Sequence, residues 1–332
     1  MTNDRKGALK KLKSLCFSSK SNLENFRNNL DSSFSSYFLP NGVEQSEYNY
    51  GGISCDVLAP EIYASNRVML YIHGGSFVGG SRKSWRNFCA SLASKCFCRV
   101  VVPEYRLAPE NPYPASIDDI QSVFRALFTE EQVSCSLNAT EGEKPLIPEI
   151  IIAADGSGAS LVCAFLFNLR ERYRKCIKNV VFFSPWLNVS PDSKILTTKR
   201  MSDELINGDV LRKSSMMYTE TENTKLPFVS PIFATDEQLQ GFPPVYIQMG
   251  AKEILLEDAK EFTKKLIESG NKCFLDVWEN MMFMFQMADE FLHESHLALD
   301  RIGQIVTQNL AGLEEIKIEN QPKLEHSLKS EA

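Results

Sequence analysis

The chain has 332 residues, 43% hydrophobic and 23% charged, which is typical of a globular protein with one large domain or two smaller ones. Its formal net charge of −6 argues against nucleic acid or an anionic membrane as the main partner. The sequence lacks a run of about 18 apolar residues, so we expect no membrane span.

The N-terminal 45 residues are polar and helix-prone in two patches, 8–15 and 21–30. Strands and helices then alternate. Strands are predicted at 68–73, 98–103, 149–153, 180–184, 245–249 and 273–277, and helices at 86–95, 116–128, 159–174 and 259–268. Short apolar strands separated by helices indicate a mainly parallel sheet covered on both faces.

Three segments depart from this alternation. Residues 129–147 are polar and are predicted to form a surface loop, and residues 190–226 have a helical pattern typical of a cap insertion. The charged segment 312–332 is predicted to be a disordered tail. We therefore expect an N-terminal cap or lid segment, 1–45, and one α/β domain, 46–311.

The cysteines and the N-terminus bear on the compartment. The nine cysteines are scattered without metal-ligand spacing, and the first 19 residues contain no continuous apolar core of a signal peptide. These features predict reduced thiols in a cytoplasmic protein. We expect no metal and no cofactor.

A glycine-rich turn, HGGSFVGGS, follows the predicted strand at 68–73. Consecutive glycines allow backbone N–H groups to point into a cavity, as an oxyanion hole requires. The alternative interpretation is a tight turn with no binding role.

The next motif is long and specific. Residues 105–110 read YRLAPE and are followed by Pro114-Ala115 and Asp118. The chain here resembles the hormone-sensitive-lipase-like branch of the α/β-hydrolases, which includes carboxylesterases and arylacetamide deacetylases. The resemblance extends from about residue 50 to about residue 300 and implies an α/β-hydrolase fold with a helical cap.

The resemblance also implies where a nucleophile belongs. The family carries GDSAGG between a strand and a helix, and here the aligned residues are ADGSGA, so the nucleophile position is Gly156. Ser157 is the alternative nucleophile, but Asp155 two residues before it would crowd the turn. The more natural role for Ser157 is to complete an oxyanion hole through its N–H, together with Gly74 and Gly75.

The other two triad positions give an independent test of this register. The family's histidine position is Phe283 in the loop NMMFMF, and its acid position is Glu253. Without a histidine to orient, Glu253 is predicted to cap a helix start. Of the four histidines, His73 belongs to the glycine-rich turn and His326 to the tail. His293 and His296 lie on a later helix, where their spacing is typical of solvent-facing residues rather than of a metal site.

The sequence thus predicts a catalytically degenerate esterase-like protein. Its site would bind a small acyl or carboxylate ligand, or a protein partner. The apolar residues 281–285 would line the pocket or simply fill it. The alternatives are an active carboxylic-ester hydrolase using Ser157 and a purely structural remnant. Ligand identity and oligomeric state do not follow from the sequence.

Overall fold

An eight-stranded sheet forms the centre of the molecule in the computed structural model, which describes residues 3–17, 22–34, 39–137, 146–196 and 203–308. The strand order is β1-β2-β4-β3-β5-β6-β7-β8. The strands are β1 (Val43–Tyr50), β2 (Ile53–Pro60), β3 (Arg67–Ile72), β4 (Arg99–Pro103), β5 (Glu149–Asp155), β6 (Ile177–Phe183), β7 (Val245–Gly250) and β8 (Cys273–Trp278).

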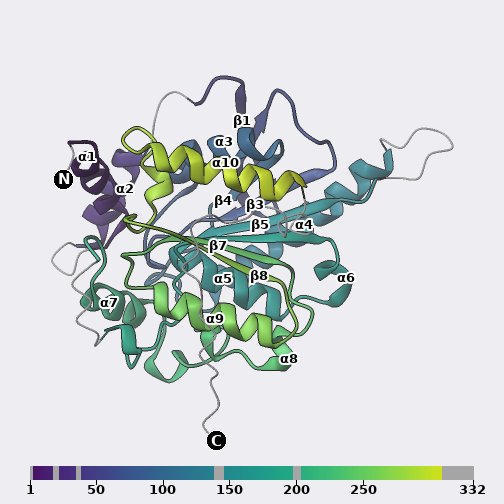
Figure 1. Ribbon diagram of the computed structural model, residues 1–332. Helices are drawn as coiled ribbons and strands as arrows, with labels where there is room; N and C mark the ends of the chain where they lie inside the picture. The colour runs from purple at the N-terminus through teal and green to yellow at the C-terminus, as the bar shows by residue number, and fades with distance from the viewer. Residues whose placement is uncertain (1–2, 18–21, 35–38, 138–145, 197–202, 309–332) are drawn as a thin grey trace, which may run out of the picture.

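Strands β3 to β8 run parallel to one another, and β1 and β2 join them antiparallel at one edge. Helices cover both faces (Figure 1): α3 (Arg82–Cys96) and α10 (His293–Gln308) lie on one face, and α4 (Ala115–Leu137), α5 (Gly156–Phe167) and α9 (Leu256–Glu268) lie on the other. This arrangement confirms the predicted α/β-hydrolase fold.

The sequence did not reveal strands β1 and β2, and it misplaced the ends of two helices. Nearly all side chains of β1 are exposed, so this strand shows no apolar alternation. Helix α4 continues to Leu137 through the predicted loop, with buried Glu131 paired to Arg99. The helix predicted over 159–174 begins earlier, at Gly156, and ends at Phe167; extended Arg170 separates it from the short α6 (Glu171–Arg174).

The remaining helices gather mainly at the carboxyl ends of the parallel strands. The N-terminal α1 (Asn3–Leu12), η1 (Lys13–Leu15) and α2 (Leu23–Phe34) lie on the same side of the molecule as α7 (Gly208–Tyr218) of the cap (Figure 1). The cap also contains η2 (Lys194–Leu196) and η3 (Thr221–Asn223), and it is followed by η4 (Pro231–Phe233), α8 (Asp236–Leu239) and, after β8, η5 (Phe285–Met287).

Two expectations fall partly or wholly outside this description. The predicted tail 312–332 lies outside the described residues, as do residues 138–145 of the predicted loop. Within the described residues, each helix is too short or too polar to cross a lipid bilayer.

Candidate functional site: a hydrolase elbow with a glycine and a phenylalanine

The turn between β5 and α5 has the geometry of a nucleophile elbow. Strand β5 ends at Asp155, and α5 begins at Gly156, whose φ of +47° lies in the left-handed region. A Cβ built on Gly156 would meet only Phe283 Cζ at 3.6 Å and Gly74 Cα at 3.9 Å, both ordinary contacts. There is therefore room for a side chain at the position where this turn normally presents a nucleophile.

The ring of Phe283 lies directly opposite that position. Phe283 is buried in the loop after β8, and the 3.6 Å separation brings it against the elbow although the two residues are far apart in sequence. An imidazole in place of this ring would stand beside a residue-156 side chain, as a general base must. The structure thus brings the two predicted triad positions together.

Glu253 is buried behind this pair. Its Oε1 accepts hydrogen bonds from Ser184 Oγ (2.8 Å) and from the Gly250 N–H, while Oε2 has no hydrogen-bond partner among the described residues. Ser184 Oγ also accepts from the N–H of Met284, the residue next to Phe283. The predicted helix-capping role of Glu253 is wrong, because its side chain bonds to β7 and to the end of β6 rather than to the N–H groups of α9.

Burial raises the pKa of Glu253 to about 8, and the two hydrogen bonds only partly oppose that shift. The carboxyl group is therefore largely protonated at neutral pH. A buried carboxyl oxygen without a partner is costly. This carboxyl group lies beside the loop that carries Phe283, at the acid position that the sequence predicted.

Gly74 and Gly75 of the glycine-rich turn have different roles, which the sequence did not predict. The Gly74 N–H donates to Asp155 Oδ1 (2.9 Å), so the prediction that Gly74 serves the oxyanion hole is corrected. Gly75 has a φ of +109°, and a Cβ there would lie 2.2 Å from the Gly79 carbonyl oxygen, so only glycine fits. Gly75 and Ser76 form the pocket wall at this turn.

Ser157 is buried at the second position of α5, where a helix leaves its N–H without an intrahelical partner. Its Oγ accepts a hydrogen bond from the Phe77 N–H at 3.0 Å. No histidine in the described part of the chain bonds to this hydroxyl, so it lacks the base that would activate it. The arrangement suits a backbone donor at the pocket and offers little to a nucleophile.

The described histidines are placed elsewhere. His73 is buried between the rings of Trp85 and Tyr105, and its Nδ1–H donates to the Gly74 carbonyl oxygen (2.8 Å). Burial lowers its pKa to about 4, which keeps the imidazole neutral. His293 and His296 are exposed on α10. Among the described residues, no group of three or more histidine, cysteine or carboxylate side chains could hold a metal ion.

Asp155 holds the elbow to the neighbouring strand. Its Oδ1 accepts from Tyr71 Oη (2.8 Å) as well as from Gly74. Burial raises the pKa of Asp155 to about 7, against the effect of these hydrogen bonds. Asp155 also lines the pocket, so the wall carries a carboxyl group that is about half ionised near pH 7.

The pocket at the elbow is small and closed by helical segments. Its volume is about 20 Å³, roughly the space of one water molecule. Its roof comes from the two segments that the sequence predicted as lid and cap, 1–45 and 190–226. Sequence reasoning did not single out the roof residues themselves, because they carry no motif. The lining consists of Leu15, Cys16, Gly75, Ser76, Trp85, Asp155, Gly156, Ser157, Trp186, Ile206, Val210, Leu211, Leu255 and Phe283.

Helix α2 fastens the N-terminal segment over this pocket. Arg27 donates to the carbonyl oxygens of Val78 (2.7 Å) and Ala108 (3.0 Å), and it pairs with Glu110 at 2.8 Å. Four residues later, Asp31 accepts hydrogen bonds from the hydroxyls at the start of α3. The contacts reach the glycine-rich turn itself, so the roof and the turn are held as one unit.

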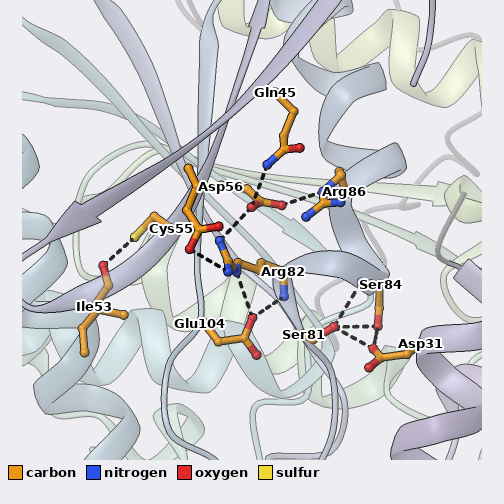
Figure 2. Close-up of polar contacts among 11 residues, drawn as sticks. Asp31, Gln45, Ile53, Cys55, Asp56, Ser81, Arg82, Ser84, Arg86 and Glu104 are labelled. Carbon is orange, nitrogen blue, oxygen red and sulfur yellow. Dashed lines mark hydrogen bonds and ion pairs between the residues drawn. The ribbon is translucent and has the colours of Figure 1, made fainter. Parts of the chain in front are cut away.

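Figure 2 shows how the start of α3 is tied both to α2 and to the sheet. Ser81 caps α3 and donates to Asp31 at 2.6 Å. The next residue, Arg82, pairs with fully buried Asp56 of β2 at 3.0 Å, and Arg86 pairs with the second oxygen of Asp56 at 2.7 Å. Both oxygens of one buried carboxylate therefore anchor the helix that follows the turn.

Comparison with known proteins agrees with this geometry. Residues 69–287 match the model of a family described by its alpha/beta hydrolase fold. The chain belongs to the α/β-hydrolase family. It is 32% identical to an esterase of Acinetobacter venetianus over 74% of this chain and 76% of that protein. It is 27% identical to an acetyl-hydrolase of Streptomyces hygroscopicus over 71% and 74% of the two chains.

A solved structure places the chain within one branch of the family. An esterase of the bacterial hormone-sensitive lipase family superposes with a TM-score of 0.80 at 26% identity, covering 93% of this chain and 98% of that one. The predicted resemblance to the hormone-sensitive-lipase-like branch is confirmed. The chain is therefore an esterase- and lipase-like α/β-hydrolase.

Proposed function

We propose that this protein is a catalytically degenerate α/β-hydrolase that retains its former active-site cleft as a pocket for a small acyl-type ligand. One observation carries the proposal: the elbow residue is Gly156, and the Phe283 ring lies 3.6 Å from where its Cβ would be. Removal of either serine or histidine from such a unit costs roughly 10⁶ in turnover, about as much as removal of the whole triad. Both are replaced here.

The lining of the pocket supports an uncharged ligand over a carboxylate. None of the described residues that form its walls is a lysine, an arginine or a histidine. Asp155 in the wall and Glu253 behind it would repel a carboxylate whenever either is ionised. An ester, an amide or a protonated acid could accept a hydrogen bond from the Ser157 N–H without this penalty. Of the two ligand classes expected, the acyl class is therefore favoured.

Ligand entry requires movement of the roof. A pocket of about 20 Å³ is too small for an acyl group. The N-terminal segment carrying Leu15 and Cys16, or the cap carrying Val210 and Leu211, must shift before a ligand can enter. The nine free cysteines support our further proposal of a reducing, cytoplasmic location.

The second candidate is ester hydrolysis through Ser157, which the names of the esterase relatives favour. Reaction with a fluorophosphonate, followed by peptide mapping, separates the two. We expect no labelled serine and no turnover of aryl acetates in the wild-type protein. Labelling of Ser157 with turnover that Ser157→Ala abolishes would establish hydrolysis instead.

Ligand binding is tested with matched pairs of short esters or amides and the corresponding carboxylates. We expect the uncharged members to raise the melting temperature and the carboxylates to have little effect at neutral pH. Failure of every compound in both series would remove the ligand-binding part of the proposal.

A further inference from the structure

A second surface lies at the amino ends of the parallel strands, at the opposite end of the sheet from the pocket. The residues that lead into β3, β4 and β5 include five exposed large apolar side chains, and we call four of them the apolar rim. Because these three strands are neighbours, the residues entering them share one surface. The rim consists of Ile62 (77% exposed), Tyr63 (40%), Phe97 (51%) and Ile147 (73%).

Two hydrogen bonds hold the three segments of the rim beside one another. The Ala64 N–H, next to Tyr63, donates to the Phe97 carbonyl oxygen at 3.0 Å. Asn66 Nδ2 donates to the Ile147 carbonyl oxygen, also at 3.0 Å. Scattered exposed apolar residues are normal on a protein surface, but a contiguous group indicates an interaction site.

The conformation of Phe97 is unusual for its residue type. Phe97 ends α3 with φ 47° and ψ 49°, a left-handed position that favours glycine or asparagine. Its ring is also half exposed, so folding gains little from burying it. Neither backbone preference nor core packing accounts for a phenylalanine here, and a contact outside this chain would.

A basic segment borders the rim at the next strand. Residues 170–178 precede and begin β6 and contain five cations (Arg170, Arg172, Arg174, Lys175 and Lys178) against one carboxylate, Glu171, a local charge of 5 − 1 = +4 in a chain of −6. Two contacts join this segment to the rim side of the sheet: Lys178 pairs with Glu149 of β5 at 2.7 Å, and the Tyr173 ring packs on Phe128 of α4 at 4.9 Å.

We propose that the apolar rim and the basic segment together form a docking surface for an anionic lipid bilayer. Exposed apolar side chains insert at the level of the headgroups, and neighbouring cations bind anionic lipids. Charges farther away than a Debye length of about 8 Å are screened, so the local excess matters more than the net charge. The overall negative charge therefore does not exclude this partner.

This surface is independent of the proposed pocket. The pocket lies at the carboxyl ends of the strands and is lined by residues of η1 and α7. In Figure 1, α6 of the basic segment and the far end of α4 lie on the other side of the molecule from α7. The pocket and the docking surface have no residue in common, so either proposal can fail alone.

Cosedimentation of the full chain with lipid vesicles tests the proposal. We expect binding to phosphatidylcholine vesicles containing about one third phosphatidylserine, and loss of that binding in about 0.5 M salt. Vesicles of phosphatidylcholine alone should bind much less. The double substitution Arg170→Gln/Lys175→Gln should weaken binding about fivefold for each cation removed.

Phe97→Asn tests the rim without disturbing the fold, since asparagine tolerates the left-handed conformation. It should leave the melting temperature unchanged or higher and weaken vesicle binding about tenfold. Met216→Asn is the matched control, because Met216 is 77% exposed on α7 beside the pocket and should not affect vesicle binding.

Three results would overturn the proposal. The first is absence of binding to either kind of vesicle. The second is a failure of either expected dependence. Charged and neutral vesicles would bind equally well, or Phe97→Asn would leave binding unchanged. The third is a concentration-dependent dimer, measured by light scattering, that Phe97→Asn abolishes, since the rim would then be an interface between two copies of this chain.

Discussion

The double substitution Gly156→Ser/Phe283→His is the sharpest test of the elbow. It places a hydroxyl at the turn and an imidazole opposite it, in a site that keeps the Ser157 N–H and the buried Glu253 carboxyl. If the alignment of the elbow is right, the protein gains esterase activity. Each single variant should stay at background, because the serine and the histidine act as a unit.

The structure indicates that the variant will fold. A side chain at the φ of +47° of residue 156 costs about 1–2 kcal/mol relative to glycine. The new Cβ meets nothing closer than 3.6 Å, so no overlap adds to that cost. Replacement of the Phe283 ring by a smaller one adds about 1–2 kcal/mol, which together corresponds to a fall of roughly 5 °C in melting temperature.

Activity is measured as aryl acetate turnover, and the reacting residue as the fluorophosphonate-labelled peptide. We expect turnover of the double variant at least about 10²-fold above wild type, a modest fraction of what an intact triad contributes. The label should map to position 156. A double variant that folds within a few degrees of wild type, yet neither labels nor turns over substrate, would refute the placement of the triad.

Three further predictions concern Glu253, the carboxylate that anchors α3, and the roof of the pocket. Burial raises the pKa of Glu253 to about 8, whereas in the unfolded chain this carboxyl has its ordinary pKa of 4.5. Between these two pH values the folded protein therefore holds a proton that the unfolded chain has released. The free energy of unfolding then falls with rising pH, by up to about 1.4 kcal/mol per pH unit. Glu253→Gln should make the decline measured in denaturant titrations from about pH 6 to about pH 8 shallower, with the part due to Asp155 remaining, and an unchanged slope would contradict the assignment. Asp56→Asn should lower the free energy of unfolding by about 2–4 kcal/mol, because Arg82 and Arg86 lose their shared carboxylate but keep some solvent exposure. Arg27→Ala should loosen the roof and speed maleimide labelling of Cys16 about tenfold, whereas equal rates would show that α2 does not hold the roof closed.

The sequence determined the fold and pointed to Gly156 and Phe283 as the residues at two predicted triad positions. The parallel strands are short apolar runs whose character is local, so each could be located without knowledge of its neighbours. Gly156 lies between a strand and a helix that fix its alignment from both sides, and Phe283 lies in a separately recognisable loop. The polar edge strand β1 could not be found in this way, because its residues have no buried face to leave a pattern.

Only the tertiary structure decided what these positions do together. Three contacts between distant segments define the site. The Phe283 ring lies against Gly156, and Asp155 accepts the hydrogen bond of the Gly74 N–H. Glu253 bonds to Ser184 rather than to a helix start. The roof over the pocket and the apolar rim at the amino ends of the strands also depend on contacts between segments that are distant in sequence. Local sequence records the preference of each segment for helix or strand, whereas a site depends on which segments the packed sheet brings side by side.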